Sequence, residues 1–476
     1  MHIQLPKIIQ GGLGAGVSNW RLAQAVSRIG QLGVVSGTAL DQILARRLQD
    51  GDPDGHMRRA LAHFPFPNMA KRVQDALFIP GGRKPGEPYK SIGMLSVKSH
   101  HWSEELCIVG NFVEVFLARE GHDNPVGINY LEKIQFPHLP SIYGAMLAGV
   151  AVVIVGAGIP VEMPGVLDVL AIHQSATYSL HVRGAQPGAH IQSHFDPAAF
   201  CEEGVALSPL QRPDFLAIIS SDALAGVLVK KATGKVDGFV IEGPLAGGHN
   251  APPRGPMHLT PQGEPIYGPR DAVDLAAMRK LGLPFWLAGS YGSPERLQEA
   301  LAAGAAGVQV GTAFALCEES GLVPEARHAL IAQALVGNAK IFTDPTASPT
   351  GFPFKLAQLK GTLSEEGVYQ HRHRICDLGF LREAYVLPDG TIGYRCPAEP
   401  ETAFVAKGGK VEDAAHRRCL CNGLLANIGL PQSFTDGNHE LCLITLGDDV
   451  AGVGRFCTVD HPDFTAADVV RVMLKA

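Results

Sequence analysis

Eight short apolar segments, each long enough for a buried strand, restrict the fold of this chain more than any other feature. They lie at residues 7–10, 33–36, 126–130, 151–155, 215–220, 238–242, 285–288 and 307–310. Amphipathic helical patterns follow most of them, as at 19–29, 223–232 and 294–303. Apolar strands that alternate with helices are typical of a parallel sheet covered by helices. Eight such strands predict a closed (β/α)8 TIM barrel. A ninth segment, 178–182, could replace one of the eight as a barrel strand.

The length of the chain requires more than a barrel. It has 476 residues, whereas such a barrel typically takes about 250. Part of the excess lies in two insertions, a helical one at 38–120 and a second at 156–213. Because insertions at this end of a barrel usually shape the active site, we expect both to form a lid. A bend rich in Pro and Gly at 343–354 then separates a barrel at 1–340 from a C-terminal subdomain at 341–476.

Composition excludes several kinds of partner. The net charge is -6 and the isoelectric point is about 6.3, so neither nucleic acid nor an acidic membrane surface is an expected partner. No segment has the roughly 18 uninterrupted apolar residues of a membrane span. Nine cysteines are too few for a disulfide scaffold of this size, and residues 1–6 show no signal-peptide pattern. We therefore expect a reducing, cytoplasmic location.

Glycines follow three of the predicted strands. Gly11, Gly12 and Gly14 come directly after the first strand, where they would let the backbone approach a flat ligand. A turn of this kind, taken alone, is more often structural. Glycine-rich loops also end strands seven and eight, and this pair forms a common phosphate site in barrels. Backbone N–H groups and the dipole of a helix after Thr312 would hold the dianion there. The alternative is that these glycines only permit tight packing.

A histidine follows two glycines at the end of the sixth strand. The segment runs Glu242-Gly-Pro-Leu-Ala-Gly-Gly-His249, so it places an imidazole at the barrel mouth with little side-chain bulk before it. Imidazole titrates near neutrality and can transfer a proton at a substrate carbon. A lone histidine is more often structural, but the two glycines and the strand end favour a catalytic residue here.

These motifs together resemble the nitronate monooxygenase family, also called 2-nitropropane dioxygenases, which includes flavin enoyl thioester reductases. The similarity extends over about two-thirds of the chain. It rests on residues 9–14, 127–129, 288–289 and 307–312 and on the Ala-Gly-Gly-His block that ends at His249. The resemblance implies a TIM barrel with an inserted lid and FMN as the cofactor, with NAD(P)H as a candidate electron donor.

The resemblance also implies roles for individual residues. His249 would be the catalytic residue. The flavin ring would lie near Gly11, Gly12 and Asn129, with Ser220 or Ser221 near the ribityl chain or the ring edge. The phosphate would be held by Gly289, Gly292, Gly311 and Thr312. The other cofactor-binding residues expected from the shared motifs are Leu13, Gly247, Gly248 and Ala288.

Departures from the family leave three hypotheses about activity. Ser290 stands where simple members have glycine, and Asn250 stands where they tend to have a basic residue. The insertions and the 343–354 segment look more like the enoyl reductase subunit of polyunsaturated-fatty-acid and polyketide synthases. The first hypothesis is oxidation of a nitronate or nitroalkane, a small molecule, with oxygen. The second is NAD(P)H-dependent reduction of an acyl thioester beside a synthase partner. The third is a non-catalytic flavin scaffold, and a homodimer is compatible with all three.

Cysteines in the tail suggest a metal site. Six of the nine lie after residue 375, and Cys419 and Cys421 form a close pair with Cys396 and Cys376 upstream. Four thiolates could bind zinc or an iron–sulfur cluster. The spacing is not that of a Cys-x-x-Cys knuckle, and the alternative is a set of buried small hydrophobic residues.

Overall fold

A computed structural model describes residues 5–98 and 100–475, so residues 1–4 of the segment without a signal pattern lie outside it. Eight parallel strands form its central sheet: β1 (Ile8–Gln10), β2 (Gly33–Ser36), β3 (Val126–Leu131), β4 (Val152–Gly156), β8 (Asp214–Ile219), β9 (Gly238–Glu242), β10 (Phe285–Ala288) and β11 (Gly307–Val310). The strand order is β1-β11-β10-β9-β8-β4-β3-β2. A parallel bridge between Ile9 and Leu32 joins the first strand to the start of the second. The sheet is therefore a closed barrel, which confirms the predicted TIM fold.

Alternation of side chains along each strand separates two apolar cores. Ile9, Val34 and Val240 point into the barrel, where they pack with Ile154 and the fully buried Trp286. Their neighbours along the strands belong to the larger core under the surrounding helices. Both faces of each strand are thus buried, which explains why the segments are mostly apolar.

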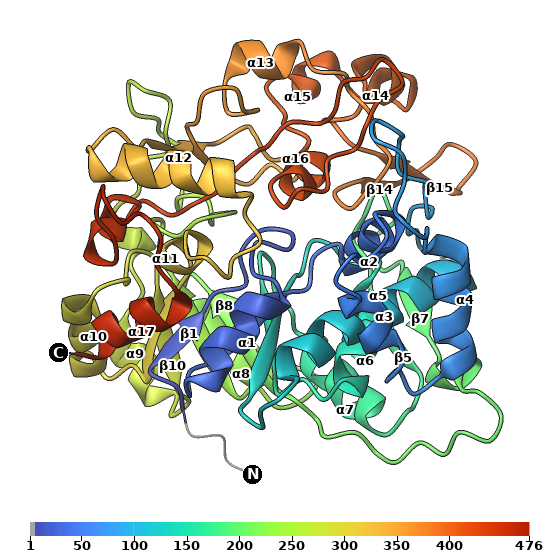
Figure 1. Ribbon diagram of the computed structural model, residues 1–476. Coiled ribbons are helices and arrows are strands. Elements are labelled where there is room, and N and C mark those ends of the chain that lie inside the picture. The colour runs from blue at the N-terminus through green and yellow to red at the C-terminus, as the bar shows by residue number, and fades with distance from the viewer. Residues whose placement is uncertain (1–4, 99, 476) are drawn as a thin grey trace.

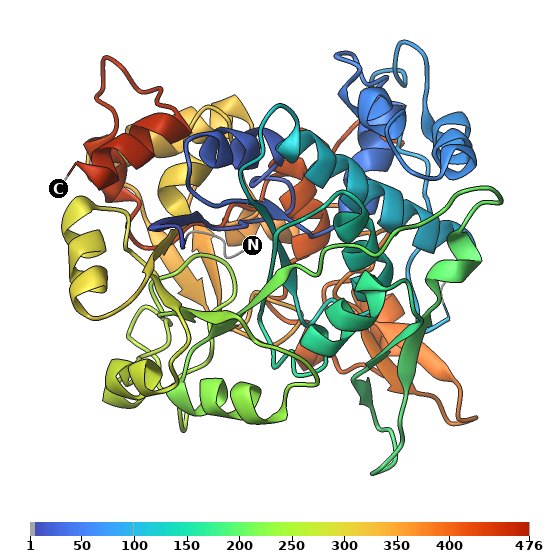
Figure 2. The ribbon, with the colours of Figure 1, turned by 90° about the horizontal axis from the view of Figure 1, so that it is seen from below.

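Helices surround the barrel, as the view from below shows (Figure 2). Outside the first insertion and the segment that covers the barrel mouth, the helices are α1 (Trp20–Arg28), α6 (His138–Leu147), α7 (Met163–Ala171), α8 (Asp222–Lys231), α9 (Leu275–Lys280), α10 (Pro294–Ala302), α11 (Thr312–Ala315), α12 (Pro324–Leu335), which lies beside the tail, and α17 (Ala466–Leu474). The last of these comes from the end of the chain and packs against α1 and α10 (Figure 1). Among the described residues, no helix combines the length and the apolar character that a membrane crossing needs.

The two insertions have different structures. The first is helical as predicted, with α2 (Leu40–Gln49), α3 (His56–Leu61), α4 (Pro67–Leu77) and α5 (His101–Arg119). The second holds β5 (Ala176–Ser179), β6 (Val182–Arg183), β7 (Gln192–Phe195) and the short helix η1 (Pro197–Phe200). The ninth strand candidate, 178–182, is therefore not a barrel strand. It is divided between β5, which pairs with β7, and β6, which pairs with the tail, and residues of β5 alternate between buried and exposed.

The tail covers the C-terminal end of the barrel (Figure 1). Its elements are β12 (Ile341–Asp344), β13 (Phe354–Ala357), α13 (Glu366–Gln370), β14 (Glu383–Val386), β15 (Ile392–Arg395), α14 (Glu401–Ala406), α15 (Val411–Ala414), α16 (Leu420–Ala426) and η3 (Ala451–Arg455). The Lys355 amide donates to the Gly248 carbonyl at 3.0 Å, and the Asn250 amide donates to the Pro353 carbonyl at 2.9 Å. The predicted division near residue 341 stays a prediction, and the contacts show that the tail forms part of the barrel mouth.

Candidate active site

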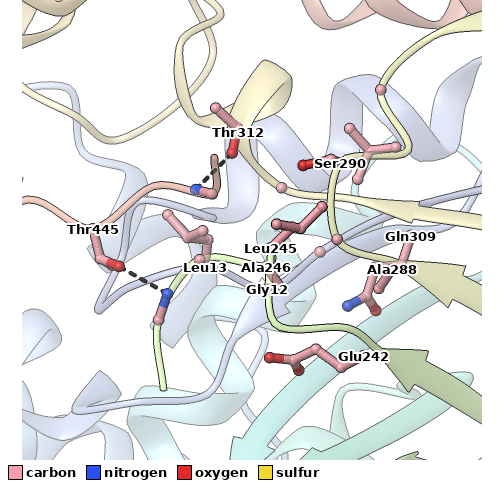
Figure 3. Close-up of a pocket in the computed structure, with 18 of the residues that line it drawn as sticks. Gly12, Leu13, Glu242, Leu245, Ala246, Ala288, Ser290, Gln309, Thr312 and Thr445 are labelled. Carbon is pink, nitrogen blue, oxygen red and sulfur yellow. Dashed lines mark hydrogen bonds between the residues drawn. The ribbon is translucent and has the colours of Figure 1, made fainter. Parts of the chain in front are cut away.

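A cavity open to solvent lies at the C-terminal ends of the barrel strands. Its empty space is about 1320 Å³ when part of the solvent at its mouth is included. The period-two alternation explains its floor, because the last inward position of several strands is small or polar. Val240 points inward, so Glu242 does as well, and by the same alternation Asn129 and Gln309 face the cavity from β3 and β11. Figure 3 shows the Glu242 and Gln309 side chains on this floor.

The predicted catalytic residue and most of the predicted flavin residues line this one cavity. The group comprises Gly11, Gly12, Leu13, Asn129, Gly247, Gly248, His249, Ala288, Gly289, Gly292, Gly311 and Thr312. Ser220 and Ser221 are not in its wall. The Ser221 hydroxyl accepts a bond from the Leu224 amide at 3.1 Å and caps α8, while the Ser220 carbonyl accepts from Arg254 at 3.1 Å. A flavin contact by these two serines stays a prediction.

Two glycines allow close backbone approaches at the cavity wall. A Cβ on Gly12 would lie 2.6 Å from the Asn129 Cβ, and a Cβ on Gly247 would lie 2.8 Å from the Leu446 carbonyl carbon. Real Cβ atoms do not approach so closely, so larger residues would displace either β3 or the tail. Gly247, the first of the two glycines before His249, therefore serves the docking of the tail as well as access to the cavity.

The predicted phosphate end combines barrel loops with tail residues that the sequence did not suggest. Thr312 Oγ1 accepts a hydrogen bond from the Gly447 amide at 2.9 Å (Figure 3). Arg455 and Asp449 line the same cavity and form an ion pair at 2.9 Å. Helix α11 after Gly311 has only four residues, so its dipole is smaller than the sequence led us to expect. Backbone N–H groups and the Arg455 guanidinium are left as the candidate partners of a phosphate.

Ser290 adopts the backbone conformation that normally favours glycine. Its φ is +61°, in the left-handed region, where a side chain costs roughly 1–2 kcal/mol. This explains in physical terms why glycine suits the position, and the serine here is strained.

We expect Ser290→Gly to stabilise the chain by roughly 0.5–1 kcal/mol, because the strain relieved exceeds the added flexibility of the unfolded chain. Ser290→Val should destabilise it, since β-branching is least compatible with positive φ. Denaturant unfolding of both variants measures the effect. A loss of stability in Ser290→Gly would show that the hydroxyl has a role that outweighs the strain.

His249 is held by the tail. Its Nε2 lies 2.7 Å from Ser348 Oγ, which in turn lies 2.8 Å from Thr350 Oγ1, and the Phe354 ring packs edge-on at 4.9 Å between centroids. Burial, followed by the charge of Lys133, lowers the imidazole pKa to about 3. The side chain is therefore neutral at physiological pH, unlike the near-neutral titration expected from sequence. A neutral imidazole can still accept or donate one hydrogen bond at each nitrogen.

Sequence reasoning missed two ionisable groups beside this histidine. Burial raises the pKa of Glu242 to about 8, and burial lowers the pKa of Lys133 to about 7. The Lys133 ammonium lies 2.7 Å from the Phe352 ring centroid and has no hydrogen-bond partner within the described part of the chain. Both groups thus favour their uncharged forms. The signal available in the sequence was the inward register of Glu242, two residues after Val240.

We expect Glu242→Gln to become increasingly stabilising, relative to the unmodified chain, as the pH rises from 5 to 7. The unfolded carboxyl loses its proton near its ordinary pKa of 4.5, whereas the folded one keeps it until about 8. Raising the pH through this window therefore favours the unfolded state, on the order of 1 kcal/mol per pH unit. His249 has the opposite effect below pH 6.5, so the measurement is the difference between the two chains in urea unfolding at each pH. A difference that does not change with pH would exclude a buried protonated carboxyl.

The residues present fit a flavin in two respects. The Gln309 Oε1 atom is buried beside Gly11 and lacks a hydrogen-bond partner among the residues described, so it is available to a ring N–H. The floor around it has little side-chain bulk, because Gly11, Gly12 and Ala288 line it. A flat, hydrogen-bonding ring is the kind of ligand that such a floor accommodates.

The four predicted metal ligands also come together, away from this cavity. A single narrow cavity within the tail is lined by Cys376, Cys396, Cys419 and Cys421, and it has room for about one water molecule. No three His, Cys, Asp or Glu residues in the described ranges are arranged to hold a metal ion. Metal binding at these cysteines therefore stays a proposal.

Comparison with known families decides the kind of protein to which the barrel is related. Residues 202–345 match the nitronate monooxygenase family. The matched segment contains His249 and both glycine-rich loops, so the resemblance seen in the sequence is confirmed there. The match to the nitronate monooxygenase family indicates an oxidoreductase enzyme that uses a flavin, in preference to a scaffold.

Solved structures show more distant likenesses. The FabK protein of Thermotoga maritima has 16% identity over 99% of this chain and 92% of that chain, with a TM-score of 0.48. A nitroalkane oxidase of Streptomyces ansochromogenes has 14% identity over 99% of this chain and 95% of that chain, with a TM-score of 0.49. The enoyl reductase domain of MlnA, from the macrolactin biosynthesis cluster of Bacillus amyloliquefaciens, has 12% identity over 75% of this chain and 64% of that chain, with a TM-score of 0.36. At these values the likenesses do not bear on function, and no curated protein matches the chain significantly.

Proposed function

We propose that the chain is an FMN-dependent oxidoreductase that oxidises a nitronate or nitroalkane with oxygen. The observation that supports this most is the overlap between family and geometry. The segment that matches nitronate monooxygenase contributes His249, Gly289, Gly292 and Gly311, and all four line one cavity. Flavin, when bound, supplies the electron transfer, while the protein supplies binding and orientation.

The residues of the chain have distinct parts in this proposal. The loops ending at Gly292 and Thr312 would hold the FMN phosphate, with Arg455 as the neighbouring cation. Gly11, Gly12 and Gln309 would lie against the ring. The tautomer of His249 that donates from Nε2 to Ser348 leaves a lone pair on Nδ1. That nitrogen would accept the proton of a neutral nitroalkane, and the nitronate anion formed beside it would favour the imidazolium against the burial that lowers its pKa.

One observation favours the enoyl thioester reductase as a second candidate. The 343–354 segment, whose sequence looks like that of synthase enoyl reductases, contacts His249 through Ser348 and Phe354. The segment that departs from simple nitronate monooxygenases is thus next to the reacting position. In this reaction NAD(P)H would be the electron donor, and His249 would donate a hydrogen bond to the thioester carbonyl of a substrate presented by a synthase partner.

Anaerobic reduction of the bound flavin distinguishes the two candidates. The protein is mixed separately with NADPH, NADH and propionate 3-nitronate, and flavin bleaching is followed by absorbance. Bleaching by the nitronate alone supports the first candidate. Bleaching by a nicotinamide followed by reoxidation with a crotonyl thioester supports the second. A flavin that none of these reagents reduces contradicts both.

A further inference from the structure

Three residues lie side by side across the floor of the active-site cavity, each at or near the end of its own barrel strand. Glu242 of β9 pairs in register with Ala288 of β10, which pairs in turn with Gln309 of β11. All three line the cavity, and Figure 3 shows the two polar side chains on its floor. Neighbouring strands are about 4.8 Å apart, so the backbones of the two polar residues are about 10 Å apart. Only the methyl group of the alanine stands between them.

The Glu242 carboxyl faces the cavity without a partner from the protein. Within the described ranges it forms neither a hydrogen bond nor an ion pair, and Lys133 acts on it only through space. Burial raises the pKa of Glu242 to about 8, against the smaller opposing effect of Lys133. A carboxyl that keeps its proton is a hydrogen-bond donor as well as an acceptor. This donor is therefore available to a bound ligand.

The titratable groups around the carboxyl do not take over its proton. Lys133 follows β3, Tyr267 lies between β9 and β10, and His249 follows β9 itself. Burial lowers the pKa of Lys133 to about 7 and that of His249 to about 3, and it raises the pKa of Tyr267 to about 12. At pH 6 the lysine is thus the one charged member of this group, and Glu242 stays protonated beside it.

The level of Glu242 in the barrel favours a contact with the flavin ring over a contact with the substrate. It shares its row with Gln309, whose Cγ would lie 3.4 Å from a Cβ on Gly11, and both of these residues are proposed to lie against the ring. His249, the proposed proton acceptor, comes later in the chain and is held by Ser348 of the tail, which covers the barrel mouth. A ligand group on the floor is therefore within reach of Glu242, while one at the mouth meets the imidazole.

We propose that Glu242 donates a hydrogen bond to the flavin ring and thereby favours the reduced form of the flavin. This role rests on the proposed function, because it requires FMN in the cavity. The ring gains electron density when it is reduced, and a hydrogen bond to an acceptor of increased charge is stronger. A carboxylic acid that its surroundings keep neutral can supply such a bond without placing a negative charge beside the ring. Glu242 is then the residue that raises the reduction potential of the flavin.

The reduction potential of the bound flavin tests this role without any substrate. Equilibration of the full chain with a reference dye at pH 6, in the absence of oxygen, gives the ratio between the dissociation constants of reduced and oxidised FMN. We expect Glu242→Leu to weaken reduced FMN about tenfold or more relative to oxidised FMN, the size of a lost hydrogen bond to a charged group. Glu242→Gln is the matched control, because its amide keeps a donor and cannot ionise. Its ratio should stay close to that of the unmodified chain.

A second measurement decides even if Glu242→Leu fails to fold. At pH 9 the unmodified carboxyl has lost its proton, since its pKa is about 8. The change from pH 6 to pH 9 should therefore weaken reduced FMN more in the unmodified chain than in Glu242→Gln, whereas the neighbouring groups titrate alike in both. Equal changes in the two chains would overturn the proposal.

Three other results would overturn it as well. A ratio in Glu242→Leu equal to that of the unmodified chain would mean that the carboxyl does not contact the ring. Equal weakening of both oxidation states would place it at another part of the flavin. Tighter binding of reduced FMN by Glu242→Gln at pH 6 would show that the carboxyl is ionised. An unmodified chain that binds FMN in neither state contradicts the proposed function itself, so the two failures are distinguishable.

Discussion

Gly311→Asp is expected to abolish flavin binding while the barrel stays folded. Gly311 has a φ of -109°, which any residue can adopt, and an added Cβ would meet only Leu13 Cδ1 at 3.3 Å. The new carboxylate would lie against the phosphate dianion. Two like unit charges 4 Å apart repel by about 4 kcal/mol at an effective dielectric constant of 20. The expected loss of affinity is therefore about 10³-fold or more.

Gly311→Asn is the matched control, because asparagine has the shape of aspartate without its charge. FMN titration followed by fluorescence quenching measures both affinities, and circular dichroism checks the fold. We expect asparagine to weaken binding far less than aspartate. Equal losses in the two variants would mean that steric exclusion, not phosphate repulsion, acts at this position. Unchanged affinity in Gly311→Asp would show that the phosphate lies elsewhere.

His249→Ala is expected to retain flavin and fold but to lose turnover about 10²–10⁴-fold with a substrate that needs proton transfer. The imidazole faces the cavity and is neutral because burial lowers its pKa to about 3. Its loss removes the group best placed to accept or donate that proton. A preformed nitronate has already lost the proton, so its turnover should fall less. The comparison of a neutral nitroalkane with its nitronate separates proton transfer from charge stabilisation.

Ser348→Ala is the companion variant for this test. Its hydroxyl lies 2.7 Å from His249 Nε2, so its removal frees the imidazole to rotate without removing it. We expect a smaller loss of kcat, on the order of tenfold, with KM little changed.

Because His249 stays neutral, this residue should cause no break near pH 6.5 in the pH profile of the rate of the unmodified enzyme. Wild-type turnover of every substrate by His249→Ala would make this a structural histidine.

The barrel could be predicted because each strand is marked by the residues of its own short segment. Each of the eight strands is mostly apolar and buried on both faces, so the segments near 33–36 or 307–310 stand out without any knowledge of their partners. The glycine-rich loops could be predicted for the same reason, since their position directly after a strand fixes the end of the barrel at which they lie. Ser220 and Ser221 also follow a barrel strand directly, but the Ser221 side chain caps helix α8.

The rest of the site depends on contacts between distant residues. Ser348 is 99 residues from His249, and Thr445, which binds the Gly248 amide at 2.8 Å, is 197 residues from it. No periodicity in the sequence records such pairs. The lowered pKa of His249 has the same origin, because it is caused mainly by burial under distant segments and to a smaller extent by Lys133. Glu242 could have been found from strand register alone.

The identity of the released flavin tests the central claim most directly. The glycine loops after β10 and β11 are proposed to bind a terminal phosphate, so heat-denatured protein should release one FMN per chain on chromatography. The same protein should show a flavin absorbance spectrum before denaturation. Release of FAD, or a folded chain that takes up no flavin after reconstitution with FMN, would contradict the account.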